Sequence, residues 1–561
     1  MPDYPLPVID LDQIADAGAR RAICGLLNLV EELMTENRTL RAEVQRLRDE
    51  NNRLKGEQGQ PTIKANTRST APAGDHSSER ERRRPTPRQV SGKLQQIPID
   101  RTEVLPVDPA LLPPDAEFKG HEPVVVQDVV FRTDNVLFQK EKWYSPAARK
   151  SYLAPLPPGY EGEFGPGIKA LTLVFYHAGQ MSEPKILEVL RSVGVKISDG
   201  HLSNLLIKGQ EPFHAEKAAL VEAGLRSSPW QHTDDTATRV NGHNQHCHIL
   251  CNPLYTAYTT LPGKDRLSVL DVLRNGRPRT FLLNDEALGS LARVHVSGLT
   301  RQRLLQLPYD QVLDEPTLLR LVAEHLAGVG AQQRQWIRDA LAVAAYHAQA
   351  EGPVVQLLVC DDAPQFTGLT EELGLCWVHE GRHYKKLDPY LPQHRQELER
   401  FLTDFWAFYD VLLAYREQPS AVERGHVEAA FDTLFARETG YARLDERIAL
   451  TRGKKAHLLL VLTHPEIPLH NNPAELGARQ RVRKRDVSFG PRTVEGVRAW
   501  DTFMTLAATA RKLGVSFYHY IHDRVSGRNR MLSLADLIAQ EAQVLNLGAS
   551  WTTPSPAPST F

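Results

Sequence analysis

The sequence predicts an α/β protein in which a sheet with acidic residues at its strand ends follows two helical regions. Three observations predict this fold class. Leucine recurs every seven residues near the N-terminus, three short helical patterns lie between residues 168 and 207, and apolar, strand-like runs lead into Asp234-Asp235 and Asp361-Asp362. The length of 561 residues suggests roughly three or four domains.

Composition is that of an ordinary globular protein, with 41% hydrophobic residues, 24% charged residues and a net charge of −1. Any contact with DNA must therefore come from local basic patches. The five cysteines include no C-x-x-C pair, which is typical of a reducing compartment. We see neither a signal peptide nor an apolar run of about 20 residues, so we expect a soluble, cytoplasmic protein without a membrane partner.

Residues 20–56 carry a heptad pattern that favours a parallel two-stranded coiled coil, and hence a homodimer or higher oligomer. Leucine occupies the d positions, and β-branched residues or asparagine occupy the a positions. The two sets are Leu26, Leu33, Leu40, Leu47 and Leu54 at d, and Ile23, Val30, Asn37, Val44 and Asn51 at a. Glutamates at g precede arginines or lysine at e, as an ion-paired dimer requires. The alternative is one helix that packs on its own domain.

Residues 57–118 are rich in small, polar and proline residues, so we expect a disordered linker. It contains a basic run at residues 80–88. That run can contact phosphates without sequence preference, or it can simply keep the linker extended.

Residues 119–212 show the signals of a helix-turn-helix region. Short strands are expected at residues 123–130 and 136–138, and helices at 168–178, 182–191 and 199–207. Ser182 and Ser198 (or Asp199) are the expected N-caps, and Gly194 the expected end of the second helix. This topology places a recognition helix in a DNA groove, with His201, Ser203, Asn204 and Lys208 as candidate contacts. An ordinary helical core would give the same pattern.

Residues 225–525 contain the expected core. Strands at 228–233, 245–251 and 254–261 form a meander around an Asn241-Gly242 turn, and strands at 353–360 and 375–378 follow. Three strands, then a helix and a strand, with carboxylates at strand ends, is the layout of a ribonuclease-H-like fold. Residues 264–350 and 388–460 read as helical insertions, and residues 526–561 as a C-terminal helix and tail.

The chemistry of such a core needs oxygen ligands for hard divalent cations. Adjacent strand residues point to opposite faces, so only one aspartate of each pair is a primary ligand. We choose Asp234 and Asp361, with Asp235 and Asp362 in supporting or structural roles.

Glu475 is the third candidate ligand, although its spacing alone favours another role. Asn472 is a suitable N-cap and Pro473 suits the first helical turn, so Glu475 would complete a capping-box arrangement. Arg479 lies four residues on, at an ion-pair distance. Two other features are ambiguous. His243, His246, Cys247, His248 and Cys251 resemble zinc ligands, but a spacing of four on a strand would place the two thiols roughly 13 Å apart. His379 could bind DNA, help an active site, or be a structural histidine at a strand end.

Five motifs in this order resemble the DDE transposases of the insertion sequence sixty-six family, specifically the large catalytic subunit. They are residues 156–167, His232-Thr233-Asp234-Asp235-Thr236 with Val240-Asn241-Gly242, Leu358-Val359-Cys360-Asp361, Cys376-Trp377-Val378-His379, and Asn471-Asn472-Pro473-Ala474-Glu475 with Arg483-Lys484. The resemblance covers most of residues 20–525. Asp234-Asp235-Thr236 and Asp361-Asp362 stand where that family usually has Asp-Glu-Thr and Asp-Gly. Residues 119–155 lack the cysteines of its zinc element.

The resemblance implies metal-dependent cleavage and strand transfer at the ends of an insertion sequence. Asp234, Asp361 and Glu475 would hold Mg²⁺ or Mn²⁺, and the Glu475 role then outweighs capping. Arg479, Arg481, Arg483 and Lys484 would contact phosphate. Expected partners are DNA, a second copy and small accessory proteins, in a bacterial, nucleoid-associated setting. The alternatives are a non-catalytic DNA-binding regulator and a structure-specific nuclease of the same fold.

Overall fold

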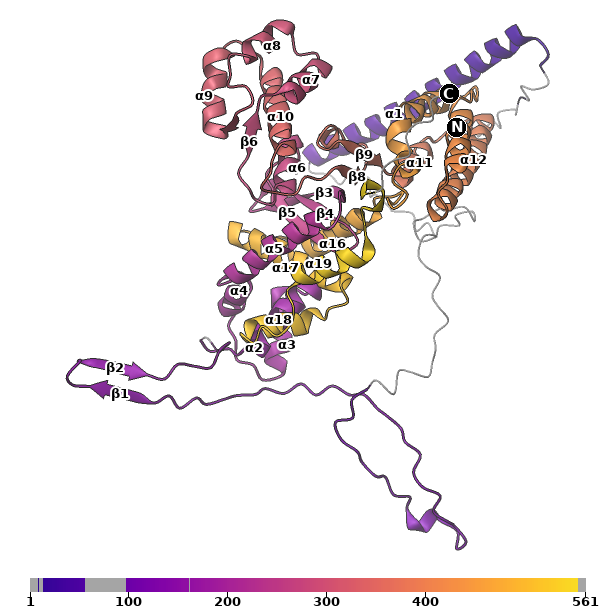
Figure 1. Cartoon of the computed structure of the whole chain (residues 1–561). Helices are drawn as coiled ribbons and strands as arrows, with labels where there is room; N and C mark the ends of the chain where they lie inside the picture. The colour runs from indigo at the N-terminus through magenta and orange to yellow at the C-terminus, as the bar shows by residue number, and fades with distance from the viewer. Residues whose placement is uncertain (1–8, 10–13, 56–96, 161, 553–561) are drawn as a thin grey trace.

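The computed structural model describes residues 9, 14–55, 97–160 and 162–552 (Figure 1). They form a mixed α/β protein with one central mixed sheet and many helices. Residues 57–96, which hold the arginine run of the expected linker, lie outside the described residues. Within the described ranges, no helix is both long and apolar enough to cross a membrane.

The central sheet has five strands in the order β5-β4-β3-β8-β9. They are β3 (Trp230–Val240), β4 (His243–Cys251), β5 (Thr256–Leu261), β8 (Leu357–Cys360) and β9 (Glu372–Leu375). The first three form an antiparallel meander, whereas β8 pairs parallel with both β3 and β9. The predicted meander and the predicted strand that ends at Cys360 are confirmed, whereas β9 lies earlier in the sequence than the strand expected at residues 375–378.

A two-residue turn joins β3 to β4, as its sequence predicts. Asn241 and Gly242 both have positive φ, 47° and 81°, and Val240 pairs directly with His243. Such a turn matches the twist of the flanking strands. The expectation that the first strand ends at Asp234 is wrong. β3 continues six residues further, to Val240, because β4 supplies hydrogen-bonding partners along the whole length.

Two long helices, α16 (Asn472–Ser488) and α17 (Val494–Lys512), pack on the meander. A Cβ at Gly477 would lie 2.8 Å from Cγ2 of Ile249, so glycine lets α16 approach the sheet closely. The hydroxyls of Thr505 and Thr509 accept hydrogen bonds from backbone amides of β5 at 3.0 and 3.2 Å. Helix α17 thus satisfies part of the free edge of the sheet.

The segment between β5 and β8 forms a largely helical lobe, as predicted for residues 264–350 (Figure 1). Its helices are α6 (Arg266–Leu273), α7 (Asp285–Arg293), α8 (Gly298–Leu304), α9 (Glu315–His325) and α10 (Ala331–His347). A small two-stranded sheet of β6 (Thr280–Leu282) and β7 (Val312–Asp314) joins them. Asp265, Asn284, Ser297 and Asp314 cap four of the helices with side-chain oxygens.

A second helical group follows β9. It comprises α11 (Trp377–Lys385), α12 (Pro392–Glu417), α13 (Ala421–Phe435), α14 (Ala442–Gly453) and α15 (Lys455–Leu458). Short 3₁₀ turns lie at Pro364–Phe366 and Leu460–Leu462. The expected strand at residues 375–378 is wrong, because β9 ends at Leu375 and α11 begins at Trp377. The Trp377 ring packs among the phenylalanines of α12 and α13, which favours a helix there.

Helix α1 (Ala17–Leu54) covers the heptad region and docks on this second group. Glu31 is buried, and its carboxylate accepts hydrogen bonds from the backbone amides of Tyr390 and Leu391 at 2.7 and 2.9 Å. Asn28 donates to the carbonyl of Gly440 at 2.9 Å. These residues occupy the b and f heptad positions, opposite the leucine stripe.

The helix-turn-helix region has its helices where the sequence predicts them. They are α2 (Pro166–Leu173), a π-helical turn (Val174–Ala178), α3 (Glu183–Ser192), α4 (Asp199–Ile207) and α5 (Glu211–Arg226). The hydroxyl of Ser198 accepts from the His201 amide at 3.2 Å, and Gly194 follows α3 with φ of 89°. Both signals are therefore confirmed.

The expected strands at residues 123–130 and 136–138 are wrong. These residues form coil without strand pairing, and all but one of their valines are exposed. The hairpin lies further on, as β1 (Lys142–Ser145) and β2 (Lys150–Leu153). Apolar alternation alone predicted strands where no second strand or core is available. A short 3₁₀ turn (Pro109–Leu111) lies in the preceding coil.

The C-terminal helices return to the region before the core. They are α18 (Phe517–Val525), α19 (Leu534–Leu545) and α20 (Ala549–Thr552). Figure 1 shows α18 beside α2 and α19 beside α5. The tail after residue 552 lies outside the described residues.

Candidate active site

Strand register brings Asp234 and Asp361 to one face of the sheet. In the parallel pair β3–β8, His232 lies opposite Val359. Asp234 comes two residues after His232, and Asp361 comes two residues after Val359. Residues two apart along a strand point to the same side of the sheet. Asp234 also pairs with Ile249, the residue that Gly477 of α16 contacts. The same face is therefore the one that α16 covers.

The two aspartates are half-buried and lie among other negative charges. Burial, together with the charges of Asp361, Asp235 and Glu475, raises the pKa of Asp234 to about 7, against a hydrogen bond from the Asp235 amide that lowers it. Burial also raises the pKa of Asp361, whose Oδ1 accepts from the Ala363 amide at 3.2 Å. Like charges that are placed close together disfavour the ionised form of one another, and burial adds to that effect.

Glu475 lies in the first turn of α16 and points to the same site. Helix α16 begins at Asn472, one residue earlier than expected, with Asn471 before it. The capping interpretation is wrong, because the Glu475 carboxylate accepts a hydrogen bond from a side chain of α11 and not from the start of its own helix. Its Oε2 accepts from Arg382 Nη2 at 3.0 Å. Its Oε1 is buried, has no hydrogen bond within the part of the chain that the structure describes, and lies 3.5 Å from Nδ1 of His379.

Asn471 fixes the start of α16 against β3, and the sequence interpretation gave it no role. It is 1% exposed. Its side-chain amide donates to the carbonyl of Thr233 at 2.7 Å, and its oxygen lies 3.0 Å from Nδ1 of His232. Its backbone amide donates to Sγ of Cys376 at 3.2 Å. Asn471 thus holds the Glu475 turn beside the strand that carries Asp234.

The second aspartate of each pair is occupied elsewhere. Asp235 accepts from Gln365 Nε2 at 3.1 Å and lies 3.8 Å from His246, so it faces away from α16. Asp362 forms an ion pair with Lys454 at 2.6 Å and lies 3.6 Å from His383. These contacts fit the predicted choice of Asp234 and Asp361 as the primary ligands.

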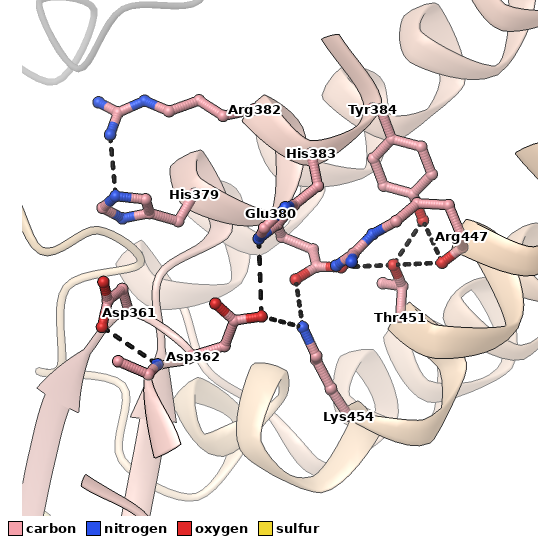
Figure 2. Close-up of polar contacts among 11 residues, drawn as sticks. Asp361, Asp362, His379, Glu380, Arg382, His383, Tyr384, Arg447, Thr451 and Lys454 are labelled. Carbon is pink, nitrogen blue, oxygen red and sulfur yellow. Dashed lines mark hydrogen bonds and ion pairs between the residues drawn. The ribbon is translucent and has the colours of Figure 1, made fainter. Parts of the chain in front are cut away.

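Behind Asp361, a network of charged side chains ties the β8 loop to α11 and α14 (Figure 2). Glu380 is buried and forms an ion pair with Arg447; it also accepts from Thr451 Oγ1 at 2.6 Å and from Lys454 Nζ at 3.1 Å. Lys454 bridges Glu380 to Asp362. Sequence interpretation missed this network, because its members are separated by up to 92 residues and carry no motif.

The described residues include two groups that could hold a metal ion, and neither contains Asp234 or Asp361. Each group brings all its ligand atoms within 4.8 Å of one another, and the two are Cys376, His379 and Glu475, and Asp362, Glu380 and His383. The first includes a thiol whose pKa burial raises to about 11, and the second already has cationic partners.

Two of the four predicted phosphate contacts on α16 are wrong. Arg481 is 1% exposed, lies 3.2 Å from Asp501 and donates to Thr260 Oγ1 at 2.9 Å. Lys484 is fully buried, and its Nζ lies 3.3 Å from the centroid of the Tyr176 ring; burial lowers its pKa to about 7. Helix α16 lies between the sheet and the helix-turn-helix region, so only part of its basic run reaches solvent.

Arg479 and Arg483 remain exposed, one turn apart on α16. The expected ion pair of Arg479 with Glu475 is replaced by the one from Arg382. On α4, Asn204 is exposed, whereas the His201 ring is half-buried, edge-on to Phe164 at 4.6 Å. Lys208 is exposed and follows the last residue of the helix.

The two ambiguous sequence features are resolved. Cys247 and Cys251 are fully buried and pack with Ile249 against α16, which leaves them as core residues and excludes the zinc interpretation. His379 is not at a strand end but in the first turn of α11, beside Glu475. It belongs to the site.

Comparison with known proteins gives one informative match. The chain is 33% identical over 330 residues to a protein of Sinorhizobium fredii (strain NBRC 101917 / NGR234) named "uncharacterized protein y4jO". The match covers 58% of this chain and 100% of that protein. No family model matches the chain, and no solved structure matches it.

Proposed function

This chain belongs to the same family as y4jO of Sinorhizobium fredii, and we propose that it is a transposase that cuts and joins DNA with divalent metal ions. The proposal includes the finer fold class, a ribonuclease-H-like core, and the resemblance to the insertion sequence sixty-six family. One observation carries it. Asp234 lies on β3, Asp361 directly follows the neighbouring parallel strand β8, and Glu475 lies on a helix packed over the same face.

The strand order supports the ribonuclease-H-like assignment. An antiparallel meander whose first strand is central, followed by two parallel strands on its far side, gives the order β5-β4-β3-β8-β9. In this order β3 and β8, the first and fourth strands along the chain, are neighbours in the sheet. A carboxylate on β3 and one at the end of β8 can therefore belong to the same site. The helical lobe between β5 and β8 leaves that pairing undisturbed.

Asp234, Asp361 and Glu475 would hold Mg²⁺ or Mn²⁺ through carboxylate oxygens. The fit rests on the raised pKa of Asp234 and on the buried, unbonded Oε1 of Glu475. Bound ions would activate water or a 3′-hydroxyl and neutralise charge on the transferred phosphoryl group. The protein holds the three carboxylates in place through β3, β8 and Asn471, while Arg479 and Arg483 offer positive charge to the DNA backbone.

The experiment is strand cutting and joining by the full chain on the DNA that flanks its gene. With Mg²⁺ or Mn²⁺ we expect cuts at the element ends that leave a 3′-hydroxyl, then joining of that end to target DNA; EDTA should abolish both. Cutting without joining would favour a structure-specific nuclease. Tight binding without any cutting, with or without added small accessory proteins, would favour a non-catalytic DNA-binding regulator.

We also propose that α1 pairs two copies through its leucine stripe, so that one assembly holds two DNA ends. Leu33 and Leu40 are 55% and 56% exposed, and the other d leucines are also exposed. Glu31 and Asn28, at the b and f positions, contact the segments that precede α12 and α14, so the leucine stripe on the opposite side of α1 is not covered by these contacts. Helix α1 can therefore pack on its own domain with one face and pair with a second copy through the opposite face. The two alternatives that the heptad pattern left open, a coiled-coil dimer and a helix packed on its own domain, are thus compatible.

Substitution in the stripe should convert a dimer to a monomer. Replacing Leu33 and Leu40 with glutamate puts two charges per chain into the apolar seam. Sedimentation equilibrium of the full chain should give a dimer for the wild type and a monomer for the double variant. Glu32→Ala, at the outward c position, should stay dimeric. A monomeric wild type at tens of micromolar would contradict the pairing.

A further inference from the structure

We infer that His379 is a positioning residue for Glu475, and that Arg382 sets which nitrogen of its ring carries the proton. The inference rests on the proposed function, because it takes Glu475 as a ligand of the metal ions. His379 and Arg382 lie three residues apart on α11, and Figure 2 shows the Arg382 guanidinium above the His379 ring.

Three contacts close a ring between α11 and α16. Arg382 Nη2 donates to Glu475 Oε2 at 3.0 Å. Arg382 Nη1 lies 3.0 Å from Nε2 of His379. Nδ1 of His379 lies 3.5 Å from the other oxygen of Glu475. Each oxygen of Glu475 therefore faces a different nitrogen-bearing group on α11.

The chemistry of these groups fixes the tautomer. A guanidinium only donates hydrogen bonds and does not deprotonate in proteins. Nε2 of His379 must then accept, so a neutral ring carries its proton on Nδ1. Nδ1 and Glu475 Oε1 are both buried, and neither has a hydrogen bond among the described residues. The Nδ1 proton is thus directed at Glu475 Oε1.

A small movement would convert this approach into a hydrogen bond when Glu475 binds a metal. Ligand side chains at metal sites depend on such outer partners for their orientation, and losing one typically costs about 10–100-fold in metal affinity. His379 and Arg382 would then fix the orientation of the Glu475 carboxylate from α11. Because His379 is 27% exposed, it can be replaced without opening the core.

The test uses amide side chains that place a donor at one ring position or the other. Asparagine puts its NH₂ near the Nδ1 position, and glutamine near the Nε2 position. We expect Mn²⁺ titration of the full chain by calorimetry to give an affinity for His379→Asn within a few-fold of wild type. His379→Gln and His379→Ala should bind about 10-fold more weakly. The control is His426→Ala, at a surface position 71% exposed on α13.

The outcomes separate this inference from the proposed function. If all three variants bind Mn²⁺ as the wild type does, His379 has no positioning role and only this inference fails. If all three lose binding equally, His379 is a direct ligand and the positioning role is again wrong. If the wild type binds no Mn²⁺ at this site, the metal site itself is wrong, and the inference falls with it. Equal melting temperatures would show that no variant acts through misfolding.

Discussion

Asp361→Asn should lower the rate of metal-dependent DNA cleavage by on the order of 10³-fold or more. Asparagine keeps the shape of the side chain but removes one of the negative charges that the site offers to a cation. The hydrogen bond from the Ala363 amide to Oδ1 can persist on the amide oxygen, so the loop after β8 should keep its conformation. The effect should therefore appear in cleavage and in Mn²⁺ affinity, with little change in the melting temperature.

Asp362→Asn is the matched control for that substitution. It removes a carboxylate one residue away, but one that pairs with Lys454 and His383. Lys454 retains Glu380 as a partner, so the network behind the site survives. Cleavage should fall far less than in Asp361→Asn. Equal losses of cleavage activity in Asp361→Asn and Asp362→Asn would contradict the assignment of Asp361 alone as the primary ligand.

Arg481→Ala should lower the free energy of unfolding by about 3–5 kcal/mol, the usual cost of breaking a buried ion pair. Its guanidinium is 1% exposed and packs 4.8 Å from the centroid of the Trp500 ring. The substitution also leaves Asp501 buried without its cation, although Asp501 keeps hydrogen bonds from Thr260. Chemical denaturation of the full chain, followed by tryptophan fluorescence, measures the loss.

Arg483→Ala is the contrasting variant on the same helix. Arg483 is exposed, so its removal should change stability by no more than about 0.5 kcal/mol. If Arg483 contacts a phosphate, the DNA affinity of Arg483→Ala should depend less steeply on salt than that of the wild type. The slope of log affinity against log salt concentration should be smaller in magnitude by about one. A large loss of stability in Arg483→Ala, or none in Arg481→Ala, would contradict the assignment of one arginine to the core and the other to the surface.

The features that the sequence predicts well are those governed by neighbours along the chain. The seven-residue leucine spacing predicts α1, Asn241-Gly242 predicts a tight turn, and Ser198 predicts a helix start. Apolar runs bounded by polar residues also locate the strands of the sheet. Asp234 and Asp361 could be assigned to one face because alternation along a strand is a local rule.

The errors arise where distant segments decide the outcome. Seven of the eight residues at 479–486 on α16 are charged or polar, which suggests a solvated helix. Packing against Trp500 and Tyr176 nevertheless buries Arg481 and Lys484. Glu475 has the spacing of a capping residue, but Arg382 from α11, 93 residues away in sequence, binds it instead. The alternating residues at 123–130 have no partner strand to pair with. No local pattern carries this information.

The central claim is that Asp234, Asp361 and Glu475 hold divalent cations, and crystallography tests it most directly. Crystals soaked in Mn²⁺ should give anomalous difference density between these three carboxylates, which should disappear in Asp361→Asn. The account predicts carboxylate oxygens within roughly 2–2.3 Å of the ion. Density confined to Cys376 and His379, or to Asp362, Glu380 and His383, would contradict it. So would the absence of any density in crystals of protein that is competent to bind DNA.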